Sequence, residues 1–162
     1  MGIFYGSHPT RGMRYFEDLD TGERVDCGER TLPREEIVAF AERWDPQPFH
    51  VDEAAAAETR FGDIIASGLH TLSVCNLLSY REFMQDVSVV AGRGIDDMRF
   101  PRPVSPGDTV SVAVKIEAKE TAGEPPGRGL ARFRVTGTNQ HGDRVISYVT
   151  LSLVRRQNRS DA

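Results

Sequence analysis

The sequence predicts a single α+β domain in which an antiparallel sheet wraps around one long helix. Apolar residues recur at three- and four-residue steps over residues 68–83, which indicates a helix with a wide buried surface. From about residue 86 the period becomes two, and segments 110–116, 131–136 and 145–153 alternate apolar with polar or small residues. Three such strands in succession, separated by turn residues, are typical of an antiparallel meander that can cover the helix.

Length and composition fit one domain with a real core. The chain has 162 residues, of which 39% are hydrophobic and 27% charged, as in ordinary globular proteins. We expect a loose arm over residues 1–12, the domain over 13–155 and a polar tail over 156–162. The net charge of −4 argues against nucleic acid or an anionic membrane as the main partner.

The cysteines and the chain start bear on the compartment. Cys27 and Cys75 lie far apart, outside any metal-type spacing, and we interpret them as free thiols in a reducing compartment. Met1 to Thr10 lacks a signal-peptide pattern, and no apolar run approaches membrane-spanning length. We therefore expect a cytoplasmic protein. The sequence has no His/Cys cluster that would hold a metal, so we expect no metal site.

Shorter elements precede the long helix. Residues 23–30 alternate weakly and predict a strand. A helix is predicted from Thr31 to Trp44, with Pro33 in its first turn. Asp52 can cap a second helix over residues 53–60. Ser67 is in position to cap the long helix, whose apolar stripe is Leu69, Leu72, Val74, Cys75, Leu77 and Leu78.

The stretch Trp44–His50 is the candidate functional segment. It places a carboxylate, Asp45, five residues before an imidazole, His50, with two prolines between them. Because proline lacks an N–H and restricts the residue before it, we predict a stiff extended loop instead of a helix. Two titratable groups on a rigid loop could act together as an acid/base device. Alternatively, Asp45 is a turn residue and His50 a structural histidine.

These residues occur within a longer pattern that resembles the MaoC-like dehydratases, the family that includes the R-specific enoyl-CoA hydratases. The resemblance runs from Phe16 to about Val154. It rests on Phe40-Ala41, Asp45-Pro46-Gln47-Pro48-Phe49-His50, Phe61-Gly62, Ile65-Ala66-Ser67-Gly68, Phe100, Pro103-Val104 and Pro106-Gly107-Asp108-Thr109-Val110. The family fold is the hot-dog fold, a long helix wrapped by an antiparallel sheet, which agrees with the periodicity.

The resemblance implies reversible hydration of a trans-2-enoyl thioester to the R-3-hydroxyacyl thioester. Asp45 and His50 match the family's catalytic pair, and Gly68 matches the glycine whose backbone N–H receives the thioester carbonyl. The chain departs from the common pattern at Gln47, Phe49 and Ser67, where the family often has Asn, a smaller aliphatic residue and His. These three changes concern the shape of the pocket and substrate choice, because none removes the acid/base pair.

Several residues keep more than one interpretation. Gly68 serves as oxyanion donor or only as a helix start, and Gln47 orients Asp45 or fills a turn. We interpret Ser67 as a helix cap rather than as a ligand of the substrate. His8, His70 and His141 are interpreted as incidental. Arg99, Arg102 and Arg128 could meet the phosphates of coenzyme A, and Trp44, Phe49 and Phe61 belong to the core or to an acyl pocket.

The expected substrate is an acyl-CoA or acyl-carrier-protein thioester, with coenzyme A present only as part of the substrate and no separate cofactor. Two other functions remain open: a hot-dog thioesterase, which would release free thiol, and a non-catalytic subunit that binds an acyl thioester. A sheet of this kind has unpaired edges, and small domains often pair them across a two-fold axis. We therefore expect a homodimer or higher homo-oligomer.

Overall fold

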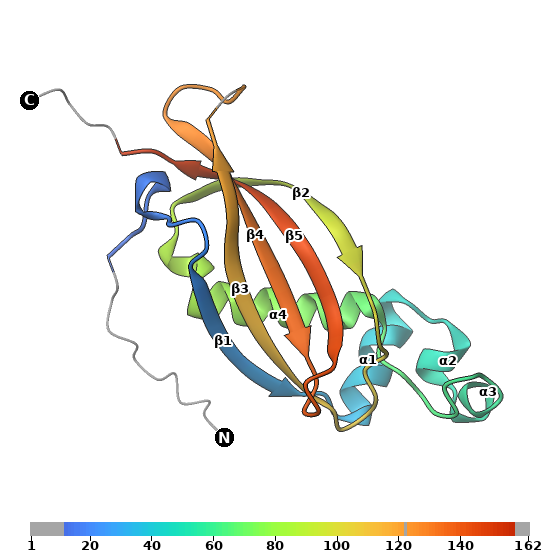
Figure 1. Ribbon diagram of the computed structural model, residues 1–162. Helices are drawn as coiled ribbons and strands as arrows, with labels where there is room; N and C mark the ends of the chain where they lie inside the picture. The colour runs from blue at the N-terminus through green and yellow to red at the C-terminus, as the bar shows by residue number, and fades with distance from the viewer. Residues whose placement is uncertain (1–11, 122, 158–162) are drawn as a thin grey trace, which may run out of the picture.

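The computed structural model describes residues 12–121 and 123–157, so most of the predicted arm and tail lies outside the described residues. A five-stranded antiparallel sheet curls around helix α4, Gly68–Glu82 (Figure 1). The predicted α+β architecture is confirmed. Among the described residues, no helix is long and apolar enough to cross a membrane.

The sheet is built on the predicted meander of β3 (Thr109–Glu120), β4 (Arg128–Thr138) and β5 (Arg144–Arg155). Strand β1 (Arg24–Thr31) pairs with β3, and β2 (Val89–Arg99) pairs with β5, giving the order β1-β3-β4-β5-β2. The chain therefore leaves one edge of the sheet after β1 and returns at the opposite edge as β2, and the helical segments lie between these two strands.

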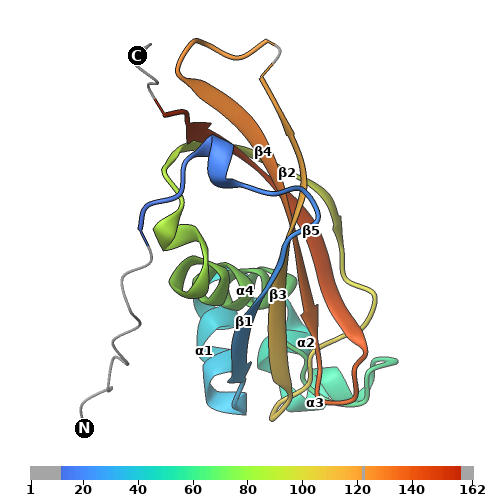
Figure 2. The same cartoon turned by 60° about the vertical axis from the view of Figure 1, so that its left-hand side comes forward.

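Helix α4 lies against the concave face of the sheet (Figure 2). The approach is close at Gly137 on β4, where an added Cβ would lie 2.8 Å from Ile146 Cγ2 and 3.1 Å from Cys75 Sγ. Glycine is needed there because a side chain would push the helix away from the sheet. The buried core includes Cys75 and Val74 of α4 and, from the sheet, Val112, Val114, Ile116, Phe133, Val135, Ile146 and Tyr148.

The opposite face of the sheet is polar, as the period of two predicts. On β4, Phe133 and Val135 are buried while Arg132 and Arg134 point outward. Arg134 donates to Glu117 Oε1 at 2.8 Å. This alternation fixes the register, because a shift of one residue would place the arginines in the core.

Three short helices gather at one end of the sheet: α1 (Arg34–Trp44), α2 (Pro48–Val51) and α3 (Glu53–Ala57) (Figure 1). The predicted start of α1 at Thr31 is wrong, since Thr31 ends β1 opposite Thr109. Pro33 is the N-cap of α1 and not part of its first turn. Asp52 caps α3 as predicted, accepting from the Ala55 N–H at 3.0 Å, but α3 is shorter than the predicted 53–60.

The prediction of an extended loop over Trp44–His50 is also wrong in its second half. Residues Pro48–Val51 form a single helical turn, in which Asp52 N–H donates to Pro48 O at 2.9 Å. Pro48 occupies the first position of that turn, where a helix needs no N–H and the fixed φ of proline is already helical. Asp45 lies before this turn as the C-cap of α1, whereas His50 lies within α2. The two candidate catalytic residues are therefore positioned by two different helices.

Helix α4 begins where predicted, with Ser67 as its cap: the Ser67 hydroxyl accepts from the Leu69 N–H at 3.1 Å. The predicted apolar stripe is wrong at Leu69, which is 50% exposed. The first turn of α4 extends toward the end of the sheet, and its buried side there carries His70 and Thr71. From Val74 and Cys75 onward the side of the helix that faces the sheet is buried, as predicted, while Leu77 and Leu78 are half-buried and Tyr80 is exposed.

Candidate active site

Asp45 is held at the junction of α1 and α4. Its N–H donates to Ala41 O at 2.8 Å and ends α1. Its carboxylate accepts from two side chains: the Ser67 hydroxyl donates to Oδ2 at 2.6 Å, and Gln47 Nε2 donates to Oδ1 at 2.9 Å. These hydrogen bonds, first from Ser67 and then from Gln47, lower the pKa of Asp45 from 3.8. Asp45 is therefore a carboxylate at neutral pH.

His50 lies on α2 and is buried, with its ring fixed from both sides. Nδ1 is 2.7 Å from the carbonyl oxygen of Ile65. A carbonyl can only accept, so Nδ1 carries the hydrogen and Nε2 of the neutral ring is left as an acceptor. The Phe49 ring contacts the imidazole edge-on, with centroids 4.4 Å apart. This packing and the Ile65 carbonyl direct Nε2 toward Asp45.

Asp45 Oδ2 and His50 Nε2 are 3.5 Å apart. When the imidazole is neutral, both atoms are acceptors, and two acceptors at this distance need a proton or a donor molecule between them. A water molecule can donate to both atoms, and an imidazolium can donate directly to the carboxylate. The pair is therefore suited to hold a water and to move one of its protons.

Gly68 supplies a backbone donor next to this pair. It is the first residue of α4, and among the described residues no acceptor lies opposite its N–H. The N-terminus of a helix carries free N–H groups and the positive end of the helix dipole. The ring of Phe100 lies directly over Gly68: an added Cβ would be 2.8 Å from Phe100 Cζ. Developing negative charge near this N–H would be stabilised.

One cavity of about 410 Å³ connects these groups. Its lining includes Asp45, Gln47, His50 and Gly68 as well as the apolar side chains of Met98, Val104 and Val145. The other residues along it are Arg60, Phe61, Ile65, Ala66, Leu69, Thr71, Phe100, Pro101, Arg102 and Pro103. The structure thus brings Asp45, His50, Gln47 and Gly68 to a single space large enough for a short acyl chain.

Other residues singled out from the sequence lie elsewhere or act differently. Phe49 does not line the cavity and packs against the core beneath His50. Trp44 is 61% exposed, so the expectation of a core or pocket residue is wrong. His70, interpreted as incidental, does not line the cavity; its ring is buried against Phe40 with centroids 4.6 Å apart and lies 3.2 Å from Glu36 Oε1.

The three arginines considered as ligands of the coenzyme A phosphates lie in different parts of the structure. Arg102 lines the cavity, whereas Arg99 lies 3.5 Å from Asp97 and Arg128 is at the far end of the sheet. Arg60 was not singled out from the sequence, and neither was Thr71. Thr71 could have been found, since it follows Ser67 by four residues and so shares its side of α4. Nothing in the sequence pattern marks Arg60.

The cysteines do not contribute a nucleophile. Cys27 and Cys75 are free, as predicted, and both are buried. Burial raises the pKa of Cys27 to about 11 and that of Cys75 to about 12, so both thiols stay protonated and unreactive near neutral pH. Among the described residues, no group of three or more His, Cys, Asp or Glu side chains could hold a metal ion.

A curled sheet around one helix, with a carboxylate and an imidazole paired beside a helix N-terminus, defines a hot-dog domain suited to proton-transfer chemistry. The pattern of the MaoC-like domain matches residues 18–136. The chain therefore belongs to the MaoC-like dehydratases, a family of hydro-lyases.

Similar proteins agree with this assignment. The 3-hydroxybutyryl-CoA dehydratase of Methylorubrum extorquens is 31% identical over 139 residues, which are 85% of this chain and 82% of that protein. The crystal structure of the MaoC-like dehydratase from Rhodospirillum rubrum has a TM-score of 0.80 at 31% identity, covering 89% of this chain and 98% of that chain. A Mycobacterium tuberculosis protein with a double hot-dog fold, Rv0216, has a TM-score of 0.71 at 21% identity over 93% and 47%, which shows the fold alone.

Proposed function

We propose that this protein catalyses the reversible hydration of trans-2-enoyl thioesters to R-3-hydroxyacyl thioesters, with Asp45 and His50 as the acid/base pair. The observation that carries the proposal is the 3.5 Å separation of Asp45 Oδ2 and His50 Nε2 in a cavity that also contains Gly68. The M. extorquens relative named a 3-hydroxybutyryl-CoA dehydratase supports the same reaction class.

In the hydration direction, the pair holds a water that donates to Asp45 Oδ2 and His50 Nε2. The water oxygen forms the bond to C3 while one O–H bond breaks and its proton passes to one member of the pair. A proton from the pair then forms the new bond at C2. The enzyme ends in its starting protonation state, and H and OH have been added across the double bond. Positioned acid/base groups of this kind contribute roughly 10²–10⁴-fold.

Negative charge develops on the thioester oxygen during this reaction, because addition at C3 leaves an enolate at C2. The Gly68 N–H at the start of α4 is the donor proposed to receive that oxygen. One donor of this kind is worth about 3–4 kcal/mol. The lowered pKa of Asp45 has a different cause: the hydroxyl of Ser67, the residue that caps the same helix, donates to its carboxylate.

The lining of the cavity supports an acyl thioester as the substrate class. Met98, Val104 and Val145 offer an apolar wall for an acyl chain, and Arg60 and Arg102 line the same cavity and could meet the phosphates of coenzyme A or of a carrier protein's phosphopantetheine. No cofactor beyond coenzyme A within the substrate is proposed, since the acid/base pair and one backbone donor supply the chemistry.

Turnover of crotonyl-CoA tests the proposal, followed as loss of the enoyl absorbance with free thiol measured in parallel. We expect loss of the double bond without thiol release. Asp45→Asn and His50→Gln should each lower kcat about 10²–10⁴-fold, while Asp26→Asn and His141→Gln, at exposed positions, should not. Thiol release would indicate a thioesterase, and acyl-CoA binding without turnover would indicate a non-catalytic subunit.

A further inference from the structure

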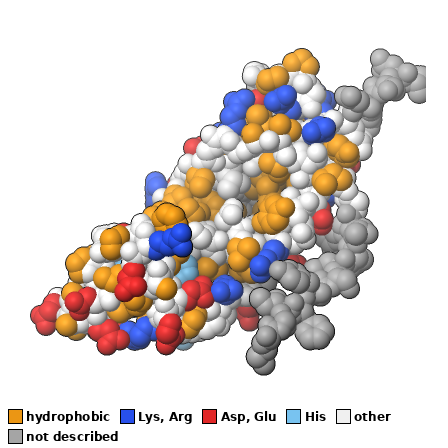
Figure 3. Space-filling view, turned by 180° about the vertical axis from the view of Figure 1, so that it is seen from behind, with side chains coloured by type: hydrophobic (Ala, Val, Ile, Leu, Met, Phe, Trp, Pro, Cys, Tyr) orange, Lys and Arg blue, Asp and Glu red, His pale blue; other side chains and the backbone are white. Residues whose placement is uncertain are grey.

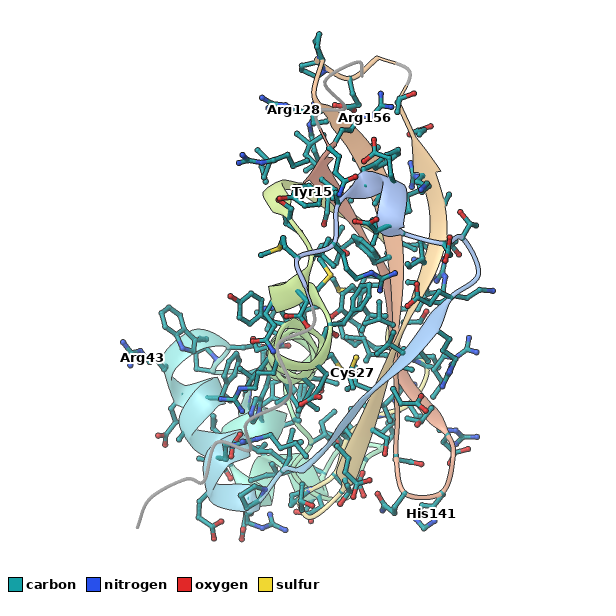
Figure 4. The ribbon with its side chains drawn as sticks, turned by 90° about the vertical axis from the view of Figure 1, so that its left-hand side faces the viewer. Tyr15, Cys27, Arg43, Arg128, His141 and Arg156 are labelled. Carbon is teal, nitrogen blue, oxygen red and sulfur yellow. The ribbon has the colours of Figure 1, made fainter. Side chains whose placement is uncertain are left out.

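A second hollow, of about 710 Å³, lies at the end of the sheet away from helices α1 to α3. It is lined by Tyr15, Val90, Pro126, Gly127, Arg128, Arg155, Arg156 and Gln157. Figure 4 shows Arg128 and Arg156 at this end, with Tyr15 below them. None of these residues lines the cavity that contains Asp45 and His50. The hollow is therefore separate from the candidate active site of the same chain.

Two of the arginines that line the hollow are placed so that their positive charges repel each other. Arg128 and Arg155 are direct cross-strand partners at the ends of β4 and β5, and like charges placed opposite each other destabilise a sheet. In the described part of the chain, neither guanidinium has a carboxylate within ion-pairing distance. Figure 3 shows Lys and Arg side chains gathered at this upper end of the molecule. An anion between the two arginines would remove the repulsion.

The third arginine is different because it is already neutralised. Arg156 Nε donates to Glu17 Oε1 at 2.9 Å, and the Gln157 N–H donates to the other oxygen of Glu17 at 3.0 Å. Each carboxylate oxygen of Glu17 therefore already accepts a hydrogen bond from residue 156 or 157. It fixes residues 156 and 157 beside the hollow without compensating Arg128 or Arg155.

The remaining walls suit an organic group attached to the anion. Tyr15 offers an aromatic ring, and Val90 and Pro126 offer apolar surface beside the two free guanidinium groups. Guanidinium groups bind phosphate oxygens in a bidentate manner. We propose that this hollow binds the phosphate groups of a small phosphate ester such as a nucleoside diphosphate, with Arg128 and Arg155 as the phosphate ligands.

Binding to the full chain by calorimetry tests this proposal without relying on turnover. The probes are pyrophosphate, ADP and coenzyme A at low salt. We expect saturable binding that weakens as salt is raised. Arg128→Gln/Arg155→Gln should weaken binding on the order of 10- to 100-fold, since each guanidinium–phosphate contact is a charged hydrogen bond. The control is Arg81→Gln/Arg144→Gln, which removes the same charge at two other exposed positions.

The probes also distinguish the source of the phosphate. Tighter binding of ADP than of pyrophosphate supports contact of the base with the apolar walls. Competition between coenzyme A and ADP supports the nucleotide end of coenzyme A as the ligand. The proposal is overturned if no probe binds saturably, or if the Arg128/Arg155 variant binds as tightly as the control. A melting temperature of the ligand-free Arg128/Arg155 variant at least equal to that of the parent shows that it folds, as relief of the cross-strand repulsion predicts.

Discussion

Ser67 has two tasks that meet in one hydroxyl group. Its Oγ accepts from the Leu69 N–H at 3.1 Å, which caps α4, and donates to Asp45 Oδ2 at 2.6 Å. A hydroxyl has one hydrogen and two lone pairs, so both bonds can exist together. The residue that starts the helix thereby also fixes one carboxylate oxygen 3.5 Å from His50 Nε2.

Replacing Ser67 with Ala should separate Asp45 from this support. We expect kcat to fall about 10- to 100-fold, because a hydrogen bond to a charged group is worth about 1.5–3 kcal/mol. The acidic limb of the pH–rate profile should move to higher pH, since the Ser67 hydrogen bond is the main cause of the lowered pKa of Asp45. Stability should fall by about 0.5–2 kcal/mol through the lost cap.

Asp52→Ala is the matched control for Ser67→Ala. It removes the cap of α3, where Asp52 accepts from the Ala55 N–H, without touching Asp45. It should lower stability and leave the acidic limb in place. An unchanged acidic limb in Ser67→Ala would mean that the hydroxyl only caps the helix.

Gly68 and Phe100 can be tested as a pair. A Cβ at position 68 would be 2.8 Å from Phe100 Cζ, but Phe100 is 48% exposed and its ring can move. Gly68→Ala should therefore fold and lose about 10-fold or more in kcat/KM, because the methyl group blocks approach to the N–H. Steady-state kinetics of Gly68→Ala/Phe100→Ala should show no recovery. Recovery would place the defect in the displaced ring.

At the scale of elements, α1 and α4 are joined by a buried contact whose residues do not line the candidate active site. His70 on α4 stacks on Phe40 of α1 and lies 3.2 Å from Glu36 Oε1. Arg30 donates to the other oxygen of Glu36 at 2.8 Å. Since α1 ends at Asp45 and α4 begins after Ser67, this contact sets the spacing of the two helices that carry the site.

This contact predicts a pH dependence of stability. Burial lowers the pKa of His70 below 6.5, and Glu36 opposes the shift only partly. The unfolded chain therefore binds a proton more readily, so stability is full above pH 6.5 and is lost as pH falls through the folded pKa. Thermal melts between about pH 7.5 and 5 should show this loss. His70→Gln should show less of it, and His141→Gln, in an exposed turn, should behave as the parent.

The periodicity of apolar residues correctly predicted those elements whose own residues follow one regular pattern. Residues 131–136 alternate strictly, and β4 has that register. The features that periodicity missed concern contacts between segments. His70 is buried only because α1 packs on α4, and the bond from Ser67 to Asp45 joins residues 22 positions apart. The helical turn at Pro48 was missed because proline stops a helix inside it but favours its first position.

At the scale of the whole molecule, the two edges of the sheet are unequal. Strand β1 is short and charged, with Arg24, Asp26 and Glu29 exposed, which discourages pairing. Strand β2 has 11 residues and exposes Val89 and Ile95 at 38% and 45%. Beside β2 lies an apolar hollow of about 370 Å³ that Tyr80 of α4, 57% exposed, also lines. Figure 3, which views the molecule from the side on which α4 lies, also shows hydrophobic side chains across its middle.

This asymmetry predicts a homodimer that pairs through β2. The 18.0 kDa chain should sediment at about twice its mass, since a second copy would cover both the free backbone groups of β2 and the apolar side chains next to it. Ile95→Lys places a charge in that surface and should shift the equilibrium toward monomer by about 10-fold or more, because burying an unpaired charge costs several kcal/mol. Glu29→Lys on β1 changes the charge of the other edge and should leave the dimer intact. A monomeric parent protein, or dissociation by Glu29→Lys in place of Ile95→Lys, would contradict pairing at β2.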